Sequence, residues 1–217
     1  MILGREKIDN AVTAVHAATT PEELSVIRTP SCAAALWHRE PRPAFQEWID
    51  TLDPGHLPRG RMILRPASVR SAVARICEAC GTPAGAERDH FADDVAALSG
   101  LFAKLMRAEW LRLRLDVVAT NACRRFHIDR VTARLVCTYR GTGTQYGVAA
   151  IGGELDPVLT VPTGAPILLR GTLWPEDPQS GIRHRSPPIE GTGETRSVLV
   201  LDPLDNPEDE PDSHGMQ

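Results

Sequence analysis

The spacing of the apolar residues changes from helical to alternating at about Trp110. In residues 87–107 the apolar side chains recur every three or four positions, as on one face of a helix that packs on a sheet. These side chains are Phe91, Val95, Leu98, Leu101, Phe102 and Leu105. In residues 111–117, leucine and valine alternate with arginine and aspartate, which is the period of a half-buried strand. The chain therefore combines a helical first part with a second part made of strands.

Further segments follow the same division. Residues 43–52 and 68–80 carry apolar residues at helical spacing, and residues 20–23 (Thr-Pro-Glu-Glu) have the hydroxyl, proline and acids of a helix start. The apolar run 33–37 is compatible with a strand. Short segments rich in Val, Leu, Ile and Thr come after Trp110, at residues 131–139, 145–149, 167–173 and 196–201. This order predicts an α+β fold whose second half is a β-sandwich or barrel.

The length of 217 residues suits one domain with short terminal extensions. We expect a partly helical N-terminal extension at residues 1–29, followed by a single domain at residues 30–202. Within that domain, residues 30–109 are expected to be helical and residues 110–202 to form the β-barrel part. Residues 203–217 and the aspartate before them contain six acidic residues, no Lys or Arg, and no apolar pattern. That segment is expected to be a disordered acidic tail.

Charge and composition argue against several classes of function. The net charge is −4, and without the acidic tail the chain is close to neutral, so charge does not indicate nucleic-acid binding. No apolar run has the length needed to cross a bilayer, and no membrane association is expected. The first seven residues lack the apolar core of a secretory signal, and five cysteines are an odd number for a disulfide framework. We therefore expect a cytoplasmic protein with reduced thiols.

The most distinctive short motif is His127-Ile128-Asp129. Residues two apart on a strand project from the same face, so an imidazole and a carboxylate can reach one ion. Continuing this alternation predicts that Tyr139 shares the inward face of the motif. Two ionisable groups that face an apolar interior cost several kcal/mol unless they are paired or bound to a metal. The motif alone is weak evidence, because the composition predicts about one His-x-acid pair by chance and His38-Arg39-Glu40 is a second.

His184 and Arg196 are the candidates that would complete such a site. Two imidazoles and one carboxylate bind Fe(II) on one face and leave the opposite face open for co-substrate and O₂. The glycines of residues 191–193 allow a hairpin that would place Arg196 near His184. A buried arginine needs an anion, which either a bound ligand or a carboxylate of the protein, Glu194 or Asp202, would supply.

Four segments of the chain resemble known families. They are residues 126–129 (Phe-His-Ile-Asp), 134–141, 184–188 and 196–202. Together they are similar to an uncharacterised bacterial family of unknown function, of the DUF 1826 type, over residues 30–202. More widely, the order of the two histidines, the aspartate and the arginine in residues 111–202 resembles the cupin-like double-stranded β-helix oxygenases that use Fe(II) and 2-oxoglutarate. That superfamily includes the prolyl-hydroxylase and AlkB-like groups.

The resemblance implies a fold, a ligand set and an activity. The implied fold is a jelly-roll, cupin-like double-stranded β-helix barrel with N-terminal helices that support one side. The implied catalytic iron ligands are His127, Asp129 and His184. Arg196 would bind 2-oxoglutarate, and Tyr139 and Arg134 would be further cofactor-binding groups beside it. The implied activity is that of an Fe(II)- and 2-oxoglutarate-dependent dioxygenase, a hydroxylase, acting on an unknown substrate.

Two other functions would use the same fold and the same metal ligands. A non-catalytic protein of metal handling or sensing would bind zinc or another divalent ion, with Cys123 near His127 and Cys137 on its expected face as further ligands. A cupin-type metalloenzyme that does not use 2-oxoglutarate is the third interpretation. Cys77 and Cys80 form a CxxC motif without a second pair, which favours two packed thiols over a zinc site.

The anion contact also has alternatives. Arg183 and Arg185 flank His184 and could bind an anion in place of Arg196. No segment of the sequence identifies a substrate-binding element, so protein, nucleic-acid and small-molecule substrates all stay open. The sequence does not indicate the oligomeric state.

Overall fold

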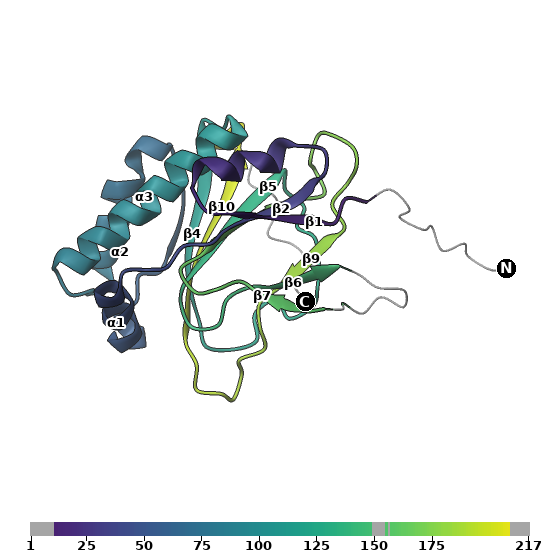
Figure 1. The fold of residues 1–217 in the computed structure, drawn as a ribbon. Coiled ribbons are helices and arrows are strands. Elements are labelled where there is room, and N and C mark those ends of the chain that lie inside the picture. The colour runs from purple at the N-terminus through teal and green to yellow at the C-terminus, as the bar shows by residue number, and fades with distance from the viewer. Residues whose placement is uncertain (1–10, 149–154, 156, 209–217) are drawn as a thin grey trace.

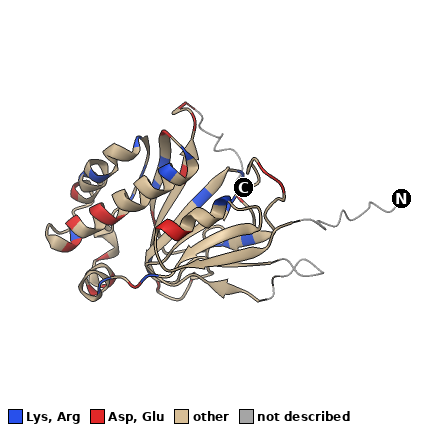
Figure 2. Ribbon diagram, turned by 45° about the horizontal axis from the view of Figure 1, so that its top comes forward, with Lys and Arg blue, Asp and Glu red and all other residues tan. Residues whose placement is uncertain are grey.

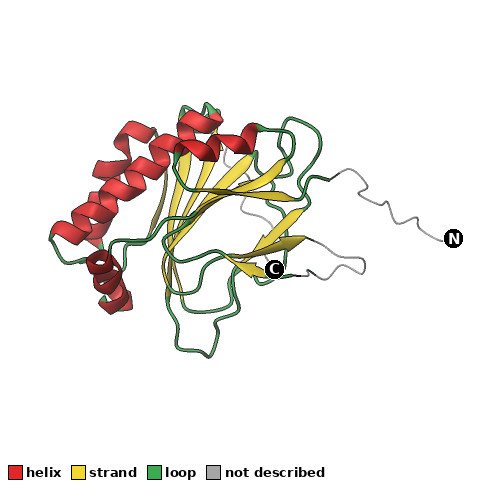
Figure 3. Cartoon of the chain, in the orientation of Figure 1, coloured by secondary structure: helices red, strands yellow, loops and turns green. Residues whose placement is uncertain are grey.

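The structure, a computed structural model, describes residues 11–148, 155 and 157–208. Figure 3 shows the helices in red and the strands in yellow. The helical elements are η1 (Glu22–Arg28), α1 (Pro43–Thr51), η2 (Pro54–His56), η3 (Pro66–Ser68), α2 (Val69–Ala79) and α3 (Ala86–Met106). The strands are β1 (Ala14–Ala18), β2 (Cys32–Trp37), β3 (Gly60–Leu64), β4 (Trp110–Val118), β5 (Ala133–Arg140), β6 (Gln145–Val148), β7 (Leu159–Thr160), β8 (Pro166–Arg170), β9 (Ile182–Arg185) and β10 (Arg196–Leu204).

Two sheets organise the strands. The large sheet has the order β1-β2-β8-β5-β10-β4-β3, and the small sheet has the order β7-β6-β9. Every pairing of these strands is antiparallel except that of β1 with β2. The helices α1, α2 and α3 lie along one face of the large sheet, and the small sheet lies on its other side (Figure 1). The chain is therefore a mixed α+β protein dominated by antiparallel sheets, as the change of period at Trp110 predicts.

The outer core lies between the helices and the large sheet. Helix α3 buries Phe91, Val95 and Phe102 there, and strand β4 contributes Leu111, Leu113 and Leu115 from its odd positions. Burying a leucine or phenylalanine side chain contributes about 1.5–3 kcal/mol. The expected packing of the helix at residues 87–107 on a sheet is confirmed.

The alternation of β4 directs its even positions toward the small sheet. Strand β10 pairs residue by residue with β4, so that Val200 lies opposite Arg114 and Asp202 lies opposite Arg112. Valines of β5 and β10 contact Tyr146 of β6 and Ile182 of β9 in a second apolar cluster between the sheets. The same pattern that buries the leucines under the helices thus carries arginine and aspartate into the space between the two sheets.

The terminal segments differ from the expected extension and tail. Residues 14–18, within the expected N-terminal extension, form β1 and join the large sheet at its edge beside β2. The expected helix start is confirmed as the 3-10 helix η1. At the other end, β10 continues through Leu204, so the first two residues of the expected tail belong to the sheet. The rest of that prediction falls mostly on residues 209–217, which lie outside the described residues. Within the described part of the chain, no helix has the length and apolarity to span a membrane.

The side chains of β5 point to the opposite faces of the sheet from those predicted. Its odd positions, including Cys137 and Tyr139, pack in the outer core under the helices, whereas Arg134 and Val136 face the space between the sheets. The alternation that starts at His127 is interrupted by a bend at residues 130–132, before β5 begins at Ala133. The prediction that Tyr139 shares the face of His127 is therefore wrong.

Tyr139 instead takes part in a polar network that connects the sheet to α3. Its hydroxyl donates to Asp94 Oδ2 at 2.6 Å. Arg39 donates to both carboxylate oxygens of Asp94, at 2.6 and 2.7 Å. Burial, and then the neighbouring Asp94 charge, raise the pKa of Tyr139 well above its ordinary value, so the phenol stays a donor. The network holds α3 against the sheet through one carboxylate.

Replacing Asp94 with asparagine should lower the free energy of unfolding by about 2–4 kcal/mol, because Arg39 would keep a partly buried charge without its partner. Urea denaturation measures this loss. The matched control is Asp93→Asn, since Asp93 and its partner Arg70 are both more than half exposed. That variant should lose about 0.5 kcal/mol or less. Equal losses in the two variants would contradict the assignment.

Candidate metal centre

His127 and His184 lie opposite each other in a two-residue antiparallel bridge. The backbone N–H of each residue donates to the carbonyl oxygen of the other, at 3.0 Å in both directions. His184 belongs to β9 of the small sheet, and His127 lies in the segment that leads from β4 to β5. Directly opposed residues of an antiparallel pair project to the same side. The two imidazole rings therefore lie together, with centroids 4.6 Å apart.

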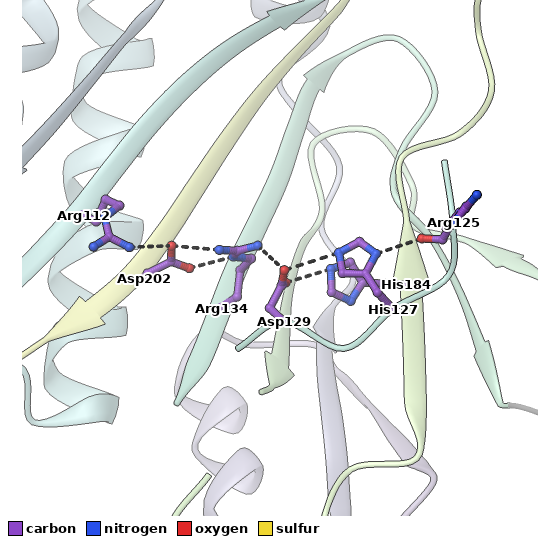
Figure 4. A network of polar contacts seen from close by, with 7 residues as sticks. All are labelled: Arg112, Arg125, His127, Asp129, Arg134, His184 and Asp202. Carbon is purple, nitrogen blue, oxygen red and sulfur yellow. Dashed lines mark hydrogen bonds and ion pairs between the residues drawn. The ribbon is translucent and has the colours of Figure 1, made fainter. Parts of the chain in front are cut away.

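Asp129 completes the cluster from two positions beyond His127. Its Oδ1 lies 3.3 Å from His127 Nε2, and its Oδ2 lies 2.9 Å from His184 Nε2 (Figure 4). One ligand atom from each of the three residues lies within 4.8 Å of the other two. Among the residues that the structure describes, no other group of three His, Cys, Asp or Glu side chains has this spacing. The three predicted ligands are brought together.

The donor atoms of the cluster are arranged for a divalent cation. Asp129 Oδ2 is buried and accepts no hydrogen bond, although His184 Nε2 is close. His127 Nδ1 lies 2.8 Å from the carbonyl oxygen of Arg125, so with Nδ1 as the donor the Nε2 lone pair is left for a metal. Two imidazole nitrogens and one carboxylate oxygen form a donor set that suits non-haem Fe(II) and also zinc. The residues present fit a bound metal.

A row of alternating charges extends from the cluster across the inner face of the large sheet. Arg134 Nη1 lies 2.5 Å from Asp129 Oδ1, and the same guanidinium donates to both oxygens of Asp202 at 2.6 and 2.9 Å. Asp202 also lies 3.8 Å from Arg112 Nη1, and both of these side chains are buried (Figure 4). Arg134 thus contacts the candidate metal ligands through Asp129. Its contacts are with protein carboxylates, while its expected role in cofactor binding stays a prediction.

The electrostatic environment shifts the pKa values of the three candidate ligands in different directions. Burial alone would raise the pKa of Asp129, but its contacts with His127, His184 and Arg134 outweigh burial and hold that pKa far below its ordinary range. The contact with Asp129 raises the pKa of His127, whereas burial lowers the pKa of His184. Without a metal, His127 therefore keeps its proton to a higher pH than His184 does.

The cluster opens into a cavity of about 590 Å³ between the two sheets, and Arg196 lines the same cavity. Arg196 is 1% exposed, and burial lowers its pKa to about 10 despite the opposing charge of Glu194. Its Nε donates to the carbonyl oxygen of Thr142 at 2.6 Å, and it makes no ion pair with a described residue. Of its two expected protein partners, Glu194 binds Thr142 and Asp202 binds Arg134. Among the described residues, no carboxylate therefore forms an ion pair with this buried cation.

The expected hairpin between His184 and Arg196 is wrong. Strand β9 pairs with β6 in the small sheet, whereas β10 pairs with β4 and β5 in the large sheet. The two residues line one cavity because the two sheets face each other. Tyr139, in the outer core, does not line this cavity.

The cysteines and arginines considered as alternative metal ligands or anion contacts do not all lie near the His127 cluster. Cys77 and Cys137 are buried in the outer core, where burial raises their pKa values to about 11 and about 12. Cys80 accepts a hydrogen bond from the backbone N–H of Arg59, whereas Cys123 lines the cavity of the histidines. Arg185 also lines the cavity, but Arg183 does not. Of the four cysteines considered as metal ligands, Cys123 alone is on the side of the site.

Sequence reasoning missed the charged residues of β3 and β4 that line the cavity. These residues are Arg59, just before β3, Arg61 of β3, and Arg114 and Asp116 of β4. The alternation of charged and apolar residues in β4 could have indicated them. The same alternation, however, is also typical of a strand whose polar face meets solvent.

Comparison with known proteins supports the fold and establishes the family. The family described as "Protein of unknown function (DUF1826)" matches residues 18–202. The chain belongs to this DUF1826 family. No curated protein matches the DUF1826 chain in sequence.

Solved structures similar to this DUF1826 protein include dioxygenases. The dioxygenase for auxin oxidation 1 from Arabidopsis thaliana, in a 2-oxoglutarate binary complex, is 9% identical with a TM-score of 0.51, over 90% of this chain and 94% of that one. The rice dioxygenase for auxin oxidation is 12% identical (TM-score 0.47; 88% and 83% covered). A 2OG-Fe(II) oxygenase family oxidoreductase from Burkholderia pseudomallei is 15% identical (TM-score 0.45; 89% and 97% covered). The likeness to the Arabidopsis enzyme shows a shared fold.

Substituting His127 with alanine should lower the affinity for Mn(II), a redox-stable substitute for Fe(II), by about 100-fold or more, because one of three protein ligands is removed. Isothermal titration calorimetry measures the affinity. The control is His38→Ala, which removes an exposed histidine from the other His-x-acid pair of the chain. If His38→Ala weakens binding as much as His127→Ala does, the ion does not bind at the His127 cluster.

Metal affinity should increase with pH through the range in which His127 titrates. The pKa of His127 is raised above its ordinary value of 6.5. The protonated imidazole therefore stabilises the metal-free protein at pH values below 6.5, and this contribution is lost as the pH rises through the raised pKa. Metal binding requires the neutral ring and releases the proton. Titrations of Mn(II) in buffers of different ionisation enthalpy should detect that release, and an affinity independent of pH would contradict it.

Proposed function

We propose that this protein is an Fe(II)- and 2-oxoglutarate-dependent oxygenase of the hydroxylase type. One observation carries the proposal: a His-Asp-His cluster lines the same cavity as a buried arginine that forms no ion pair with any described residue. The cluster supplies the ligand set of non-haem Fe(II) oxygenases. The arginine supplies the cation that the far carboxylate of 2-oxoglutarate requires.

Each residue has a defined part in this proposal. His127, Asp129 and His184 would hold Fe(II) and leave the opposite face of the ion for the co-substrate. When bound, Fe(II) with 2-oxoglutarate and O₂ supplies the oxidising chemistry, in which a substrate C–H group becomes C–OH while 2-oxoglutarate becomes succinate and CO₂. Arg196 binds the distal carboxylate, and the carbonyl oxygen of Thr142 orients its guanidinium. The closed environment around Arg196 excludes water and strengthens that ion pair.

The arrangement of the sheets agrees with this function. In the proposal, the large and small sheets are the two walls of a double-stranded β-helix, and the helices support the outer wall. The ligands come from both walls, since His184 lies on β9 and Arg196 on β10. The fold shared with the Arabidopsis dioxygenase, whose structure is a 2-oxoglutarate complex, supports this assignment.

Two alternative functions would use the same metal ligands for a different purpose. Cys123 lines the cavity, and this observation favours a non-catalytic zinc protein in metal handling or sensing. A metalloenzyme that does not use 2-oxoglutarate has no evident need for the buried cation of Arg196. The buried arginine therefore favours the oxygenase. The cytoplasmic location and the lack of membrane association stay predictions.

Replacing Arg196 with methionine should weaken 2-oxoglutarate binding by about 10- to 100-fold, because an ion pair to a buried arginine is lost, while Fe(II) binding is retained. Under anaerobic conditions, wild-type protein with Fe(II) and 2-oxoglutarate should show a visible charge-transfer band, and its titration measures the affinity. Arg183→Met is the matched control, since Arg183 flanks His184 outside the cavity lining.

With O₂, the wild-type protein should form succinate slowly even without a substrate. Tight zinc binding, with neither the band nor succinate, would favour the metal-handling alternative instead. An unchanged 2-oxoglutarate affinity in Arg196→Met would show that Arg196 is not the anchor. Arg196→Lys keeps the charge, so partial rescue separates an anion contact from a role in folding alone.

A further inference from the structure

The cavity that contains the metal cluster is strongly basic. Basic residues occur on the strands as well as on the helices (Figure 2). Six arginines line the cavity, against two aspartates, Asp116 and Asp129. The six are Arg59, Arg61, Arg114, Arg134, Arg185 and Arg196. Asp129 is already assigned to the metal, so the cavity has more cations than the proposed cofactors require.

Four of these guanidiniums have partners. Arg134 is paired with two aspartates. Arg59 donates to two backbone carbonyl groups in η2, and Arg185 donates to the side chain of a glutamine on β6. Arg196 donates to a threonine carbonyl and is the proposed contact of 2-oxoglutarate. Three of these guanidiniums therefore have protein partners, and the fourth, Arg196, is assigned to 2-oxoglutarate.

Arg61 and Arg114 differ from the other four. They are directly opposite each other in the pairing of β3 with β4, so their side chains leave the sheet on the same side. Neither guanidinium makes a hydrogen bond or an ion pair with a described residue, and Arg114 Nε is buried without a partner. Like charges in directly opposed positions destabilise a sheet, and a buried donor without a partner is also unfavourable. An anion between the two guanidiniums would remove both costs.

No acidic side chain of the described cavity lining supplies that anion. Asp116 lies two positions beyond Arg114 on the same side of β4, but it forms no ion pair with either arginine. Asp129 is held by Arg134 and by the two histidines. The arginine pair is therefore available to a ligand that enters from solution.

The surface beside the arginine pair is apolar. In the register of the large sheet, Arg114 lies opposite Val200 of β10, and Val200 lies opposite Val136 of β5. These two valines and Val198 line the cavity. A ligand held at its anionic end by the arginines would place its remaining part along these valines, on the same inner face as Arg134 beside the metal ligands.

We propose that Arg61 and Arg114 bind the anionic group of the substrate, a carboxylate or phosphate on a small organic molecule with an apolar part. Two guanidiniums on neighbouring strands can each donate two hydrogen bonds to such a group. The cavity of about 590 Å³ has room for 2-oxoglutarate and a compact substrate. The role as a substrate site rests on the proposed oxygenase function, whereas anion binding at the pair does not.

The test uses the full chain loaded with Mn(II) and 2-oxoglutarate, with benzoate and phenyl phosphate as probes and neutral benzamide as their uncharged counterpart. Calorimetry should show that one of the anions binds at least about tenfold more tightly than benzamide. Arg114→Met and Arg61→Met should each weaken that binding by about tenfold while leaving the Mn(II) and 2-oxoglutarate affinities unchanged. Arg65→Met, outside the cavity, is the control.

Tighter binding of phenyl phosphate would indicate a phosphorylated substrate, and tighter binding of benzoate would indicate a carboxylate. Equal binding of benzamide and the anions, or unchanged anion binding in both methionine variants, would overturn the proposal. Loss of 2-oxoglutarate binding in Arg114→Met would also overturn it, because the pair would then belong to the co-substrate. If 2-oxoglutarate fails to bind the wild-type protein but the arginine pair still binds the anion, the oxygenase function fails and the anion site stands.

Discussion

The reciprocal backbone hydrogen bonds between His127 and His184 are the constraint on which the candidate site depends. They join the small sheet to the segment before β5 and fix two residues that are far apart in the sequence in direct opposition. The hydrogen-bonded type of antiparallel pair keeps the Cα atoms about 5.5 Å apart, so the rings can share one ion. Asp129 then falls on the same side through the two-residue period. A slip of one residue in this bridge would turn one imidazole away.

The second constraint is the alternation of side chains along the strands of the large sheet, which gives the sheet two faces of different composition. The outer face is apolar and packs under the helices, while the inner face carries the row Arg112, Asp202, Arg134 that ends at Asp129. Buried ion pairs of this kind add little stability beyond what apolar residues of similar volume would give, because of their desolvation cost. We infer that the row positions the Asp129 carboxylate, since stability alone does not require it.

The sequence alone was sufficient to predict those elements whose structure is decided by the spacing of apolar residues within a short segment. The helix α3, the strand β4 and the pair of His127 with Asp129 follow from spacing or from a short motif, whereas His184 was expected from the resemblance to a known family. Spacing did not predict the face on which Tyr139 lies, because a bend at residues 130–132 interrupts the alternation. It did not predict the partners of β9 and β10, because strand pairing between two sheets depends on contacts distant in the sequence.

The arginines of the cavity show a further limit of prediction from sequence. An alternating strand identifies an apolar face and a polar face, but it does not reveal whether the polar face meets solvent or a second sheet. In β4 the polar face meets a cavity, so Arg114 lines a site. The short edge strands β1 and β3 have weak patterns of their own, and the position of Arg61 became apparent only from its pairing with β4.

The central claim is that two imidazoles and one carboxylate share a single ion. X-ray absorption spectroscopy of the Fe(II)-loaded protein tests it most directly, because the fine structure identifies the atoms bound to the metal. We expect only nitrogen and oxygen neighbours, with the outer-shell scattering of two imidazole rings and no sulfur. A sulfur neighbour, which Cys123 could supply, or scattering from fewer than two imidazoles would contradict the account.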